Sequence, residues 1–258
     1  MSSILRGAII LRWDSVDAAE AQSRPRALLL APAGDPDWLG EVAPILRNLG
    51  FVAQIEVSAP VADMAAEVAL VVASAAAGVP CALMQAWRAR GAVCAVVLPA
   101  GAAPAAGADA AVSTLPAPVT EAALLAMLAG QHYVALSARE AAGIAGAIAR
   151  QTFGNPAFAR ELLQALVSST RADLAQLRQA GANLEVVRGV AHRLKASAHY
   201  AGCHALRLMA QRLEHAARDG DATTAAALAA IVATTAARLL VLLASLPSAT
   251  HADSAPGK

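Results

Sequence analysis

The sequence changes character near residue 131, and this change constrains the fold more than any other feature. Residues 26–130 alternate short apolar runs of β type with stretches of helical periodicity, the pattern of an open, parallel α/β sheet. After residue 136 the strand signals end, and helical patterns joined by short turns follow. We therefore expect an α/β domain over residues 26–130 and an all-α four-helix bundle over residues 137–247.

Five strands are predicted in the α/β part. The expected ranges are residues 27–30, 51–57, 68–73, 92–98 and 110–113. Between the first two strands, Asp37 is placed to cap a helix whose apolar residues recur at helical spacing, and Gly50 is placed to end it. The run from 101 to 107 contains only Gly, Ala and Pro, which predicts a loop after the fourth strand.

The apolar composition does not predict a membrane protein. Hydrophobic residues make up 57% of the chain and the mean hydropathy is +0.51, but nearly half of these residues are Ala. The longest uncharged stretch, residues 68–87, is interrupted by Gly-Val-Pro and gains little free energy on transfer into a bilayer. The apolar run at residues 7–11 is too short for a signal peptide. We expect a cytoplasmic protein without membrane insertion.

Charge and cysteine content argue against other classes. A formal net charge of +1 gives no long-range field suited to nucleic acid, so no nucleic-acid partner is expected. Cys81, Cys94 and Cys203 include no CxxC pair, which favours neither a disulfide framework nor a zinc site. We expect them to be small buried residues in a reducing compartment.

The helical part carries clear boundary signals. Ser137 with Glu140 three residues later forms a capping box, and Asn155 followed by Pro156 opens a second helix with an apolar stripe down to residue 181. A third helix is expected over about residues 183–200. A fourth follows, and the Asp-Gly-Asp run at residues 219–221 ends it and caps a long Ala-rich fifth helix.

The third of these helices places a histidine on its outer face. With residues about 100° apart, the apolar residues fall on the side opposite His192 and face the core. Arg188, Lys195, Ala196 and His199 fall within about 60° of His192. We therefore expect an exposed imidazole with cations and one small residue around it.

An exposed histidine on a helix is most often an ordinary surface residue, and this chain has six histidines. Two features favour a chemical role for His192: Lys195 on the same face and the antiparallel helices behind it. A neutral imidazole can act as a nucleophile through one ring nitrogen, and an ammonium group can neutralise phosphoryl oxygens. With no HExxH or CxxC spacing in the sequence, we expect no metal site here and no cofactor of the protein's own.

The run HRLKASAHYAGCHAL resembles the signature of histidine-containing phosphotransfer (HPt) domains. That signature is His, any residue, an apolar residue, Lys, Gly, five residues, Gly, three residues and Leu. His192, Leu194, Lys195, Gly202 and Leu206 stand at these spacings. The resemblance extends over about residues 137–246, including the Leu-rich helix at 158–177 that precedes the signature. The departure is Ala196 where Gly is commonest, and its methyl group crowds an approaching partner slightly.

The resemblance implies roles for residues around the histidine. His192 is the phosphoryl-accepting residue, and Lys195 assists it. Glu214 occupies the position on the next helix where a Glu or Gln hydrogen-bonds the imidazole; a solvated helix carboxylate is the alternative interpretation. Arg188, Ala196 and His199 lie where a partner would dock.

The α/β part resembles a response-regulator receiver domain of the flavodoxin-like type in strand count, helix order and the run LLLAPAGDPDW. A working receiver needs an acidic pair after strand one, Asp after strand three, Thr or Ser after strand four and Lys before Pro after strand five. Strand alignment gives instead Ala33 with Gly34, Ala73, Pro99 and Leu115 before Pro116. Asp35 remains, but a single carboxylate holds Mg²⁺ weakly. We expect a phosphorylation-incompetent module that scaffolds, docks a partner or shields His192; a generic α/β domain is the alternative.

The ends of the chain give a further resemblance. Residues 1–25 are predicted to hold a strand, at residues 6–13, and a linker, and residues 248–258 a disordered tail. A strand, a linker, a receiver and an HPt domain follow one another at the C-terminus of hybrid sensor kinases. The chain therefore resembles a detached C-terminal part of such a kinase, without a Gly-rich ATP motif for kinase activity of its own.

The expected function is that of a phosphoryl carrier rather than a true enzyme. His192 would accept a phosphoryl group from a receiver aspartate and pass it to another receiver, with Mg²⁺ supplied by that partner. Two alternatives stay open. One is a binding module that docks or sequesters a receiver without chemistry, and the other is an unrelated enzyme at the carboxyl ends of the strands, which no phosphate loop or nucleophile elbow supports.

Overall fold

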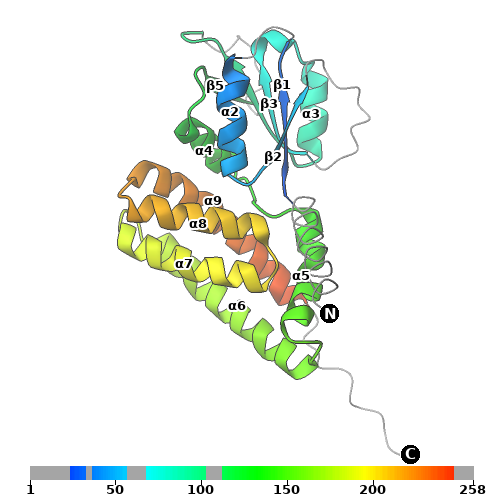
Figure 1. Ribbon diagram of the computed structural model, residues 1–258, viewed down its shortest axis with the longest axis vertical. Helices are drawn as coiled ribbons and strands as arrows, with labels where there is room; N and C mark the ends of the chain where they lie inside the picture. Colours follow the sequence, from blue (N-terminus) through cyan, green and yellow to red (C-terminus); the bar gives the residue numbers. More distant parts are fainter. Residues whose placement is uncertain (1–23, 33–36, 57–67, 103–111, 247–258) are drawn as a thin grey trace, which may run out of the picture.

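The computed structural model describes residues 24–32, 37–56, 68–102 and 112–246 (Figure 1). The strand predicted at residues 6–13 and the tail predicted at 248–258 lie outside these ranges. The described chain forms an α/β part that sits against one side of a helical bundle (Figure 1).

The α/β part contains a five-stranded sheet whose neighbouring strands are all parallel. The strands are β1 (Arg26–Leu30), β2 (Val52–Glu56), β3 (Val68–Ser74), β4 (Val93–Leu98) and β5 (Ser113–Pro116). Their order in the sheet is β2-β1-β3-β4-β5. This is the strand order of flavodoxin-like doubly wound sheets, so the predicted fold class of this part is confirmed.

Helices cover both faces of the sheet. Helices α2 (Asp37–Asn48) and α4 (Glu121–Gly130) lie on one face, and α3 (Cys81–Ala89) lies on the other (Figure 1). Strand β1 serves both faces, because Leu29 belongs to the core on the first side while Leu28 packs with α3 on the second. A strand buried on both faces explains why β1 is a continuous apolar run without alternation.

Two predictions in this part are wrong in detail. The fifth strand runs over Ser113–Pro116 and not residues 110–113, because Leu115 fills the buried position and sets the pairing with β4. Cys81 is exposed at the start of α3, whereas Cys94 and Cys203 are buried as expected. Burial raises the pKa of the Cys94 thiol to about 11 and that of Cys203 to about 12, so both remain protonated thiols.

The helical part contains the predicted bundle. Its helices are α5 (Ala138–Gln151), α6 (Pro156–Gln179), α7 (Leu184–Tyr200), α8 (His204–Arg218) and α9 (Ala222–Ser245). Helices α6 to α9 pack consecutively, and α9 closes the bundle against α6, while α5 lies across one end (Figure 1). All five predicted helices are present, and four of them form the bundle.

The helix ends confirm the predicted caps and add one that the sequence did not reveal. Ser137 and Glu140 form both hydrogen bonds of the capping box. The N-cap residue of α8, Cys203, provides no side-chain hydrogen bond, and Glu140 takes this role because its Oε1 accepts from the N–H of Ala205 at 3.0 Å. Burial raises the pKa of Glu140, while the hydrogen bonds it accepts lower it. One carboxylate thus caps α5 and α8 together.

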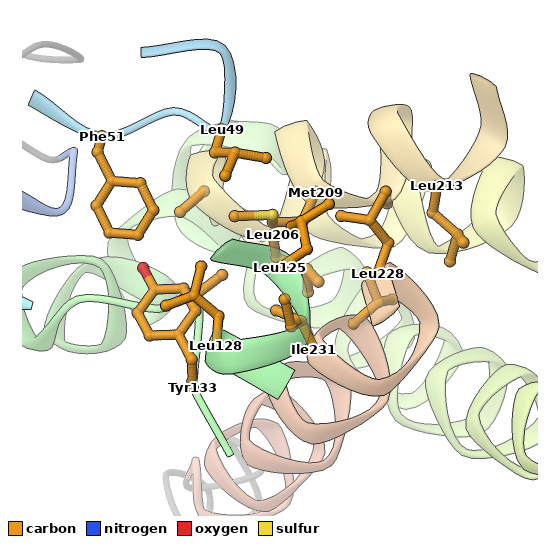
Figure 2. Packing of buried hydrophobic residues seen from close by; sticks show 14 of the residues in the cluster. Leu49, Phe51, Leu125, Leu128, Tyr133, Leu206, Met209, Leu213, Leu228 and Ile231 are labelled. Carbon is orange, nitrogen blue, oxygen red and sulfur yellow. The ribbon is translucent and has the colours of Figure 1, made fainter. Parts of the chain in front are cut away.

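The two parts share a continuous apolar core. Figure 2 shows Leu49, Phe51 and Leu128 of the α/β part packed among Leu206 and Ile231 of the bundle. Helix α4 contacts both β5 and α9, so the same helix covers the sheet and the bundle. The α/β part is therefore built into the bundle's packing, and the predicted division near residue 131 separates two patterns of secondary structure rather than two cores.

Polar contacts reinforce this junction. The N–H of Ala135 donates to Thr235 Oγ1 at 2.9 Å, and Thr235 is fully buried. Arg212 of α8 forms an ion pair with Glu121 of α4. Gly50 adopts a positive φ of 89° and approaches Leu208 of α8 closely.

Helix α9 is long and apolar enough to span a membrane by length and composition alone. In the fold it lies against α4, α6 and α8, and its large residues Leu228, Ile231, Val232 and Leu239 are fully buried. These buried residues lie on the side of α9 that packs inside the protein.

Candidate phosphotransfer site

His192 lies in the middle of α7 and faces solvent. Its side chain is 67% exposed, which confirms the orientation predicted from the helical periodicity. The opposite side of α7 is buried, with Val190, Leu194 and Ala198 fully covered by the bundle. The ring is therefore held on a rigid helix and remains open to a macromolecular partner. The described residues of the α/β part do not cover the ring, and they give no support to a shielding role for this part.

Glu214 of α8 organises the side chains around the histidine. Its Oε1 lies 3.0 Å from His192 Nδ1, and its Oε2 accepts a hydrogen bond of 2.7 Å from Lys195 Nζ. Because an ionised carboxylate can only accept, the nitrogen facing it, Nδ1, carries the ring proton. Nε2 of the neutral ring then holds the free lone pair. The contact selects the tautomer and fixes the nitrogen that is able to react.

Electrostatics keep Glu214 ionised. Its pKa is lowered chiefly by the hydrogen bond from Lys195; partial desolvation opposes this effect, and the hydrogen bond to His192 lowers the pKa by a smaller amount. Lys195 is directed at Glu214 in this structure, whereas the sequence interpretation directed it at phosphoryl oxygens. The three side chains form a hydrogen-bonded chain in which Glu214 joins Lys195 to His192.

Arginines lie one helical turn beyond this contact. Helices α7 and α8 are antiparallel, so Arg188, one turn before His192, and Arg218, one turn after Glu214, lie at the same level of the hairpin. Arg188 also binds Glu185 at 2.6 Å, and Arg218 binds Asp219 at 2.9 Å. The pKa of Arg188 is raised chiefly by Glu185; Glu214 adds to this effect and Arg218 opposes it. The positively charged side chains of Arg188 and Arg218 therefore lie on one side of the histidine.

The remaining residues predicted for docking also lie on this face. Ala196 and His199 are exposed on α7, and His199 stacks edge to face with Tyr200 at 5.6 Å between ring centroids. His204, at the start of α8, is half buried and contacts Arg207. The structure thus brings Arg188, Ala196 and His199 around His192.

Sequence reasoning missed an ion-pair cluster behind the histidine. Arg193 Nε donates to Asp173 Oδ1 at 2.6 Å, and Arg193 Nη2 donates to Gln176 Oε1 at 2.5 Å. Asp173 is buried within the apolar stripe of α6. The place of Asp173 in this stripe was the one sequence feature that could have indicated the ion pair, because a buried aspartate needs a cation as its partner. Arg218 was missed as well, and its spacing of four residues from Glu214 could have identified it.

The structure explains why the signature contains a glycine at position 202. It follows α7 with a positive φ of 72°, and a Cβ there would lie 2.8 Å from Ala147 Cβ of α5. Only glycine meets both conditions without strain. The glycine ends the histidine helix and allows α5 to pack against the bundle.

The carboxyl edge of the sheet carries little chemistry among the described residues. Because Gly50 contacts α8 just before β2 begins, the amino ends of the parallel strands face the bundle and their carboxyl ends point away (Figure 1). Ser74 ends β3 and caps a short 3₁₀ turn through Ala76 N–H, and Pro99 follows β4. Ala33, Gly34 and Asp35 lie outside the described residues.

The structure shifts one position in the receiver alignment. Leu115 and Pro116 lie within β5, so the residue after this strand is Ala117, joined to Pro118. The correction follows from the register of β5, and it replaces one apolar residue with another. The position where a receiver carries Lys is still without a cation.

Comparisons with known proteins identify the bundle alone. Residues 161–246 match the family model described as "Hpt domain". No curated protein and no solved structure matches the chain. The match begins within α6 and ends with α9, so it spans the four helices that surround the His192 site and leaves α5 and the sheet outside. Residues 161–246 form a histidine-containing phosphotransfer domain, a module with a phosphotransfer role in phosphorelay signalling.

Proposed function

We propose that His192 carries the phosphoryl group and that Nε2 is the atom that receives it. The observation that carries this proposal is the 3.0 Å contact between His192 Nδ1 and Glu214 Oε1 on an exposed helix face. It leaves Nε2 unprotonated and directed away from Glu214. An exposed nucleophile whose other nitrogen is held by a carboxylate fits the activation pattern of histidines in acyl and phosphoryl transfer.

The transfer step balances without a cofactor in this chain. The Nε2 lone pair attacks the phosphorus of a partner's aspartyl phosphate in line, the N–P bond forms, and the P–O bond to the aspartate breaks. The aspartate leaves as a carboxylate with the bonding electrons. The imidazole keeps its Nδ1 proton and gains positive charge, which the ionised Glu214 stabilises. Transfer to a second receiver reverses these steps.

Partners are receiver domains, and we propose that they supply the metal and most catalytic groups. The Mg²⁺ ion required for phosphoryl transfer would sit on the partner beside its aspartate. Lys195 keeps Glu214 ionised, and it adds positive charge near the phosphoryl oxygens. Arg188, Ala196 and His199 form the surface around the histidine on which the partner docks.

The α/β part has a supporting role in this proposal. Its receiver-like sheet carries no carboxylate pair among the described residues at the carboxyl edge, and that edge points away from His192. It therefore serves as a scaffold that packs against α8 and α9, and it receives no phosphoryl group itself.

The test is chemical labelling of the full-length protein. Phosphoramidate, a small phosphoryl donor, should label the wild-type chain once, with phosphate that is labile in acid and stable in base. The label should then pass to added receiver domains in the presence of Mg²⁺. His192→Gln removes the nucleophile, so labelling should fall to background, as measured by intact-protein mass spectrometry and ³¹P NMR.

A second histidine provides the matched control. His132 lies on an exposed turn with a φ of 53°, a conformation that asparagine tolerates, so His132→Asn should keep full labelling. A His192→Gln protein that still accepts phosphate would overturn the assignment. A wild-type chain that binds receivers and never carries phosphate would instead establish a binding module.

A further inference from the structure

We infer that the ion-pair cluster of Asp173, Arg193 and Gln176 sets the rotation of α7 and thereby positions His192 against Glu214. This inference rests on the proposed function of His192. We call the three residues the α6–α7 clamp. Arg193 acts through the histidine next to it, so it is a positioning residue rather than a catalytic one.

The geometry of the helix makes its rotation critical. The imidazole lies at roughly 6 Å from the helix axis, so a roll of about 10° displaces its nitrogens by about 1 Å. The contact of His192 Nδ1 with Glu214 Oε1 is 3.0 Å, and a displacement of that size ends it as a hydrogen bond. The tautomer that exposes Nε2 is then no longer enforced.

Apolar packing holds α7 against the bundle on its buried side. At the level of His192 this side carries Val190, Ala191 and Leu194, all fully buried. Long side chains at the flanks of the helix reach α6 and α8 and add a second constraint on its rotation. On the α6 side, the clamp supplies this constraint.

The clamp and the Glu214 contact act on opposite flanks. Arg193 follows His192 and points about 100° around the helix, toward α6. There it makes two hydrogen bonds, to Asp173 Oδ1 at 2.6 Å and to Gln176 Oε1 at 2.5 Å. His192 points toward Glu214 on α8. Helix α7 is thus bound to α8 through His192 and to α6 through Arg193. The contacts with α6 do not involve the imidazole that reacts.

The ion pair between Asp173 and Arg193 is hard to break, because the buried carboxylate needs the positive charge of Arg193. Asp173 is 4% exposed, and among the described residues its Oδ2 has no hydrogen-bond partner. A buried carboxylate left without its cation is strongly destabilising, which ties Arg193 firmly to α6. Arg193 itself is about half exposed, so the pair remains partly hydrated on the outer side.

A pair of substitutions separates positioning from stability. Arg193→Met alone leaves the Asp173 carboxylate buried without a cation, so its loss of stability would not report on the position of His192. The double variant Asp173→Leu with Arg193→Met removes both charges and restores an apolar contact, a replacement that proteins often tolerate without loss of stability. Asp173→Asn keeps an oxygen that accepts from Arg193 Nε and serves as the conservative rescue.

The measurement is phosphoryl transfer to the full-length variants, together with the titration of His192 by NMR. We expect the double variant to unfold at the wild-type temperature and to react with phosphoramidate and with phosphorylated receivers about 10- to 100-fold more slowly, the loss typical of a misplaced reactive group. Its Nδ1 proton should lose the NMR signature of the hydrogen bond to Glu214. Asp173→Asn should recover most of the rate. Arg171→Ala, an exposed arginine on α6, is the control and should react as wild type.

Each outcome bears on the inference. A stable double variant that reacts at the wild-type rate would overturn it, as would loss of reaction with receivers alone, which would make Arg193 a docking residue. If the double variant unfolds, the Asn variant decides: a retained rate with an intact His192 to Glu214 signature supports positioning, and a slow rate with that signature intact contradicts it. Failure of the wild-type protein to carry phosphate on His192 would instead defeat the proposed function.

Discussion

The sheet and the bundle bury their apolar residues equally well, yet they differ in what they present to solvent. At the carboxyl edge of the sheet, Ser74 is the last residue of β3 and caps a turn, while Ala31, Pro99 and Ala117 follow β1, β4 and β5. On the outer face of the α7–α8 hairpin, His192, Lys195 and Glu214 form a continuous network. Both parts have a packed apolar core, and the polar network on the surface belongs to the bundle.

The comparison separates the requirements of a fold from those of a site. Leu28 and Leu29 of β1 serve the two faces of the sheet whether or not its edge holds a metal. The bundle needs its polar groups at defined angles around α7, because one turn or one roll of the helix removes the contact with Glu214. A sheet with a complete core and little polar chemistry at its edge can still support neighbouring helices, and this is the scaffold role proposed above for its packing against α8 and α9.

The most severe way to break this comparison is to remove the sheet. A fragment of residues 131–258 would expose the surface of α9 that packs against Leu125 and Leu128 of α4, and the surface of α8 that packs against Leu49 and Phe51. Each large side chain contributes about 1.5–3 kcal/mol when buried, so the loss should be roughly 5 kcal/mol or more. That approaches the whole stability of a small domain.

Thermal unfolding followed by circular dichroism, with gel filtration to detect association, measures this effect. We expect the fragment to unfold at a much lower temperature than the full chain or to associate. A monomeric fragment with the unfolding temperature of the full chain would show that the halves are independent, and the sheet could then not be regarded as a scaffold.

A smaller perturbation sharpens the comparison within the bundle. Gly202→Ala places a Cβ 2.8 Å from Ala147 Cβ at a φ of 72°. The left-handed conformation and the overlap together should destabilise the protein by about 2–4 kcal/mol. Gly143→Ala on α5 is the matched control, because its Cβ meets nothing within 4 Å and the helix gains about 0.5–1 kcal/mol.

Urea unfolding gives both free energies, and labelling with phosphoramidate gives the chemistry. We expect Gly202→Ala to lose stability while its folded fraction still accepts phosphate at close to the wild-type rate. A variant of full stability would contradict the packing argument. A stable variant that is not labelled would show that Gly202 is required for phosphorylation of His192 and not for packing.

The sequence predicts those elements whose signals are local. The capping box at Ser137 and the Asn155 cap with Pro156 are read within a few residues, and the structure confirms them. The exposure of His192 follows from the spacing of apolar residues on a single helix, so it too was predictable. The fifth strand was misplaced because its register depends on the burial of Leu115 against other elements, which no local pattern encodes.

The parts of the site that escaped prediction join different helices. Asp173 and Arg193 are 20 residues apart in the chain, and nothing in either helix alone states that they meet. Lys195 was expected to neutralise phosphoryl oxygens and in this structure binds Glu214, a contact set by the angle between α7 and α8. The common core had no signal either, since a helix such as α4 that serves the sheet on one side and the bundle on the other has only an apolar composition.

The smallest expected effect is a shift in the pKa of Glu214. It tests whether Lys195, Glu214 and His192 form one connected polar network in the bundle. The pKa of Glu214 is lowered from 4.5, first by the hydrogen bond of Lys195 and then by His192. Because its folded-state pKa is depressed, Glu214 adds to stability above its unfolded pKa, and this contribution is lost as pH falls through the lower folded value. The ¹³C resonance of the Glu214 carboxyl should therefore titrate with a midpoint below 4.5. In Lys195→Met the midpoint should rise, and it should rise less in His192→Gln, since Lys195 is the larger cause. An unchanged midpoint in Lys195→Met would mean that the ammonium group does not hold the carboxylate, and the orienting chain from Lys195 to His192 would then have to be given up.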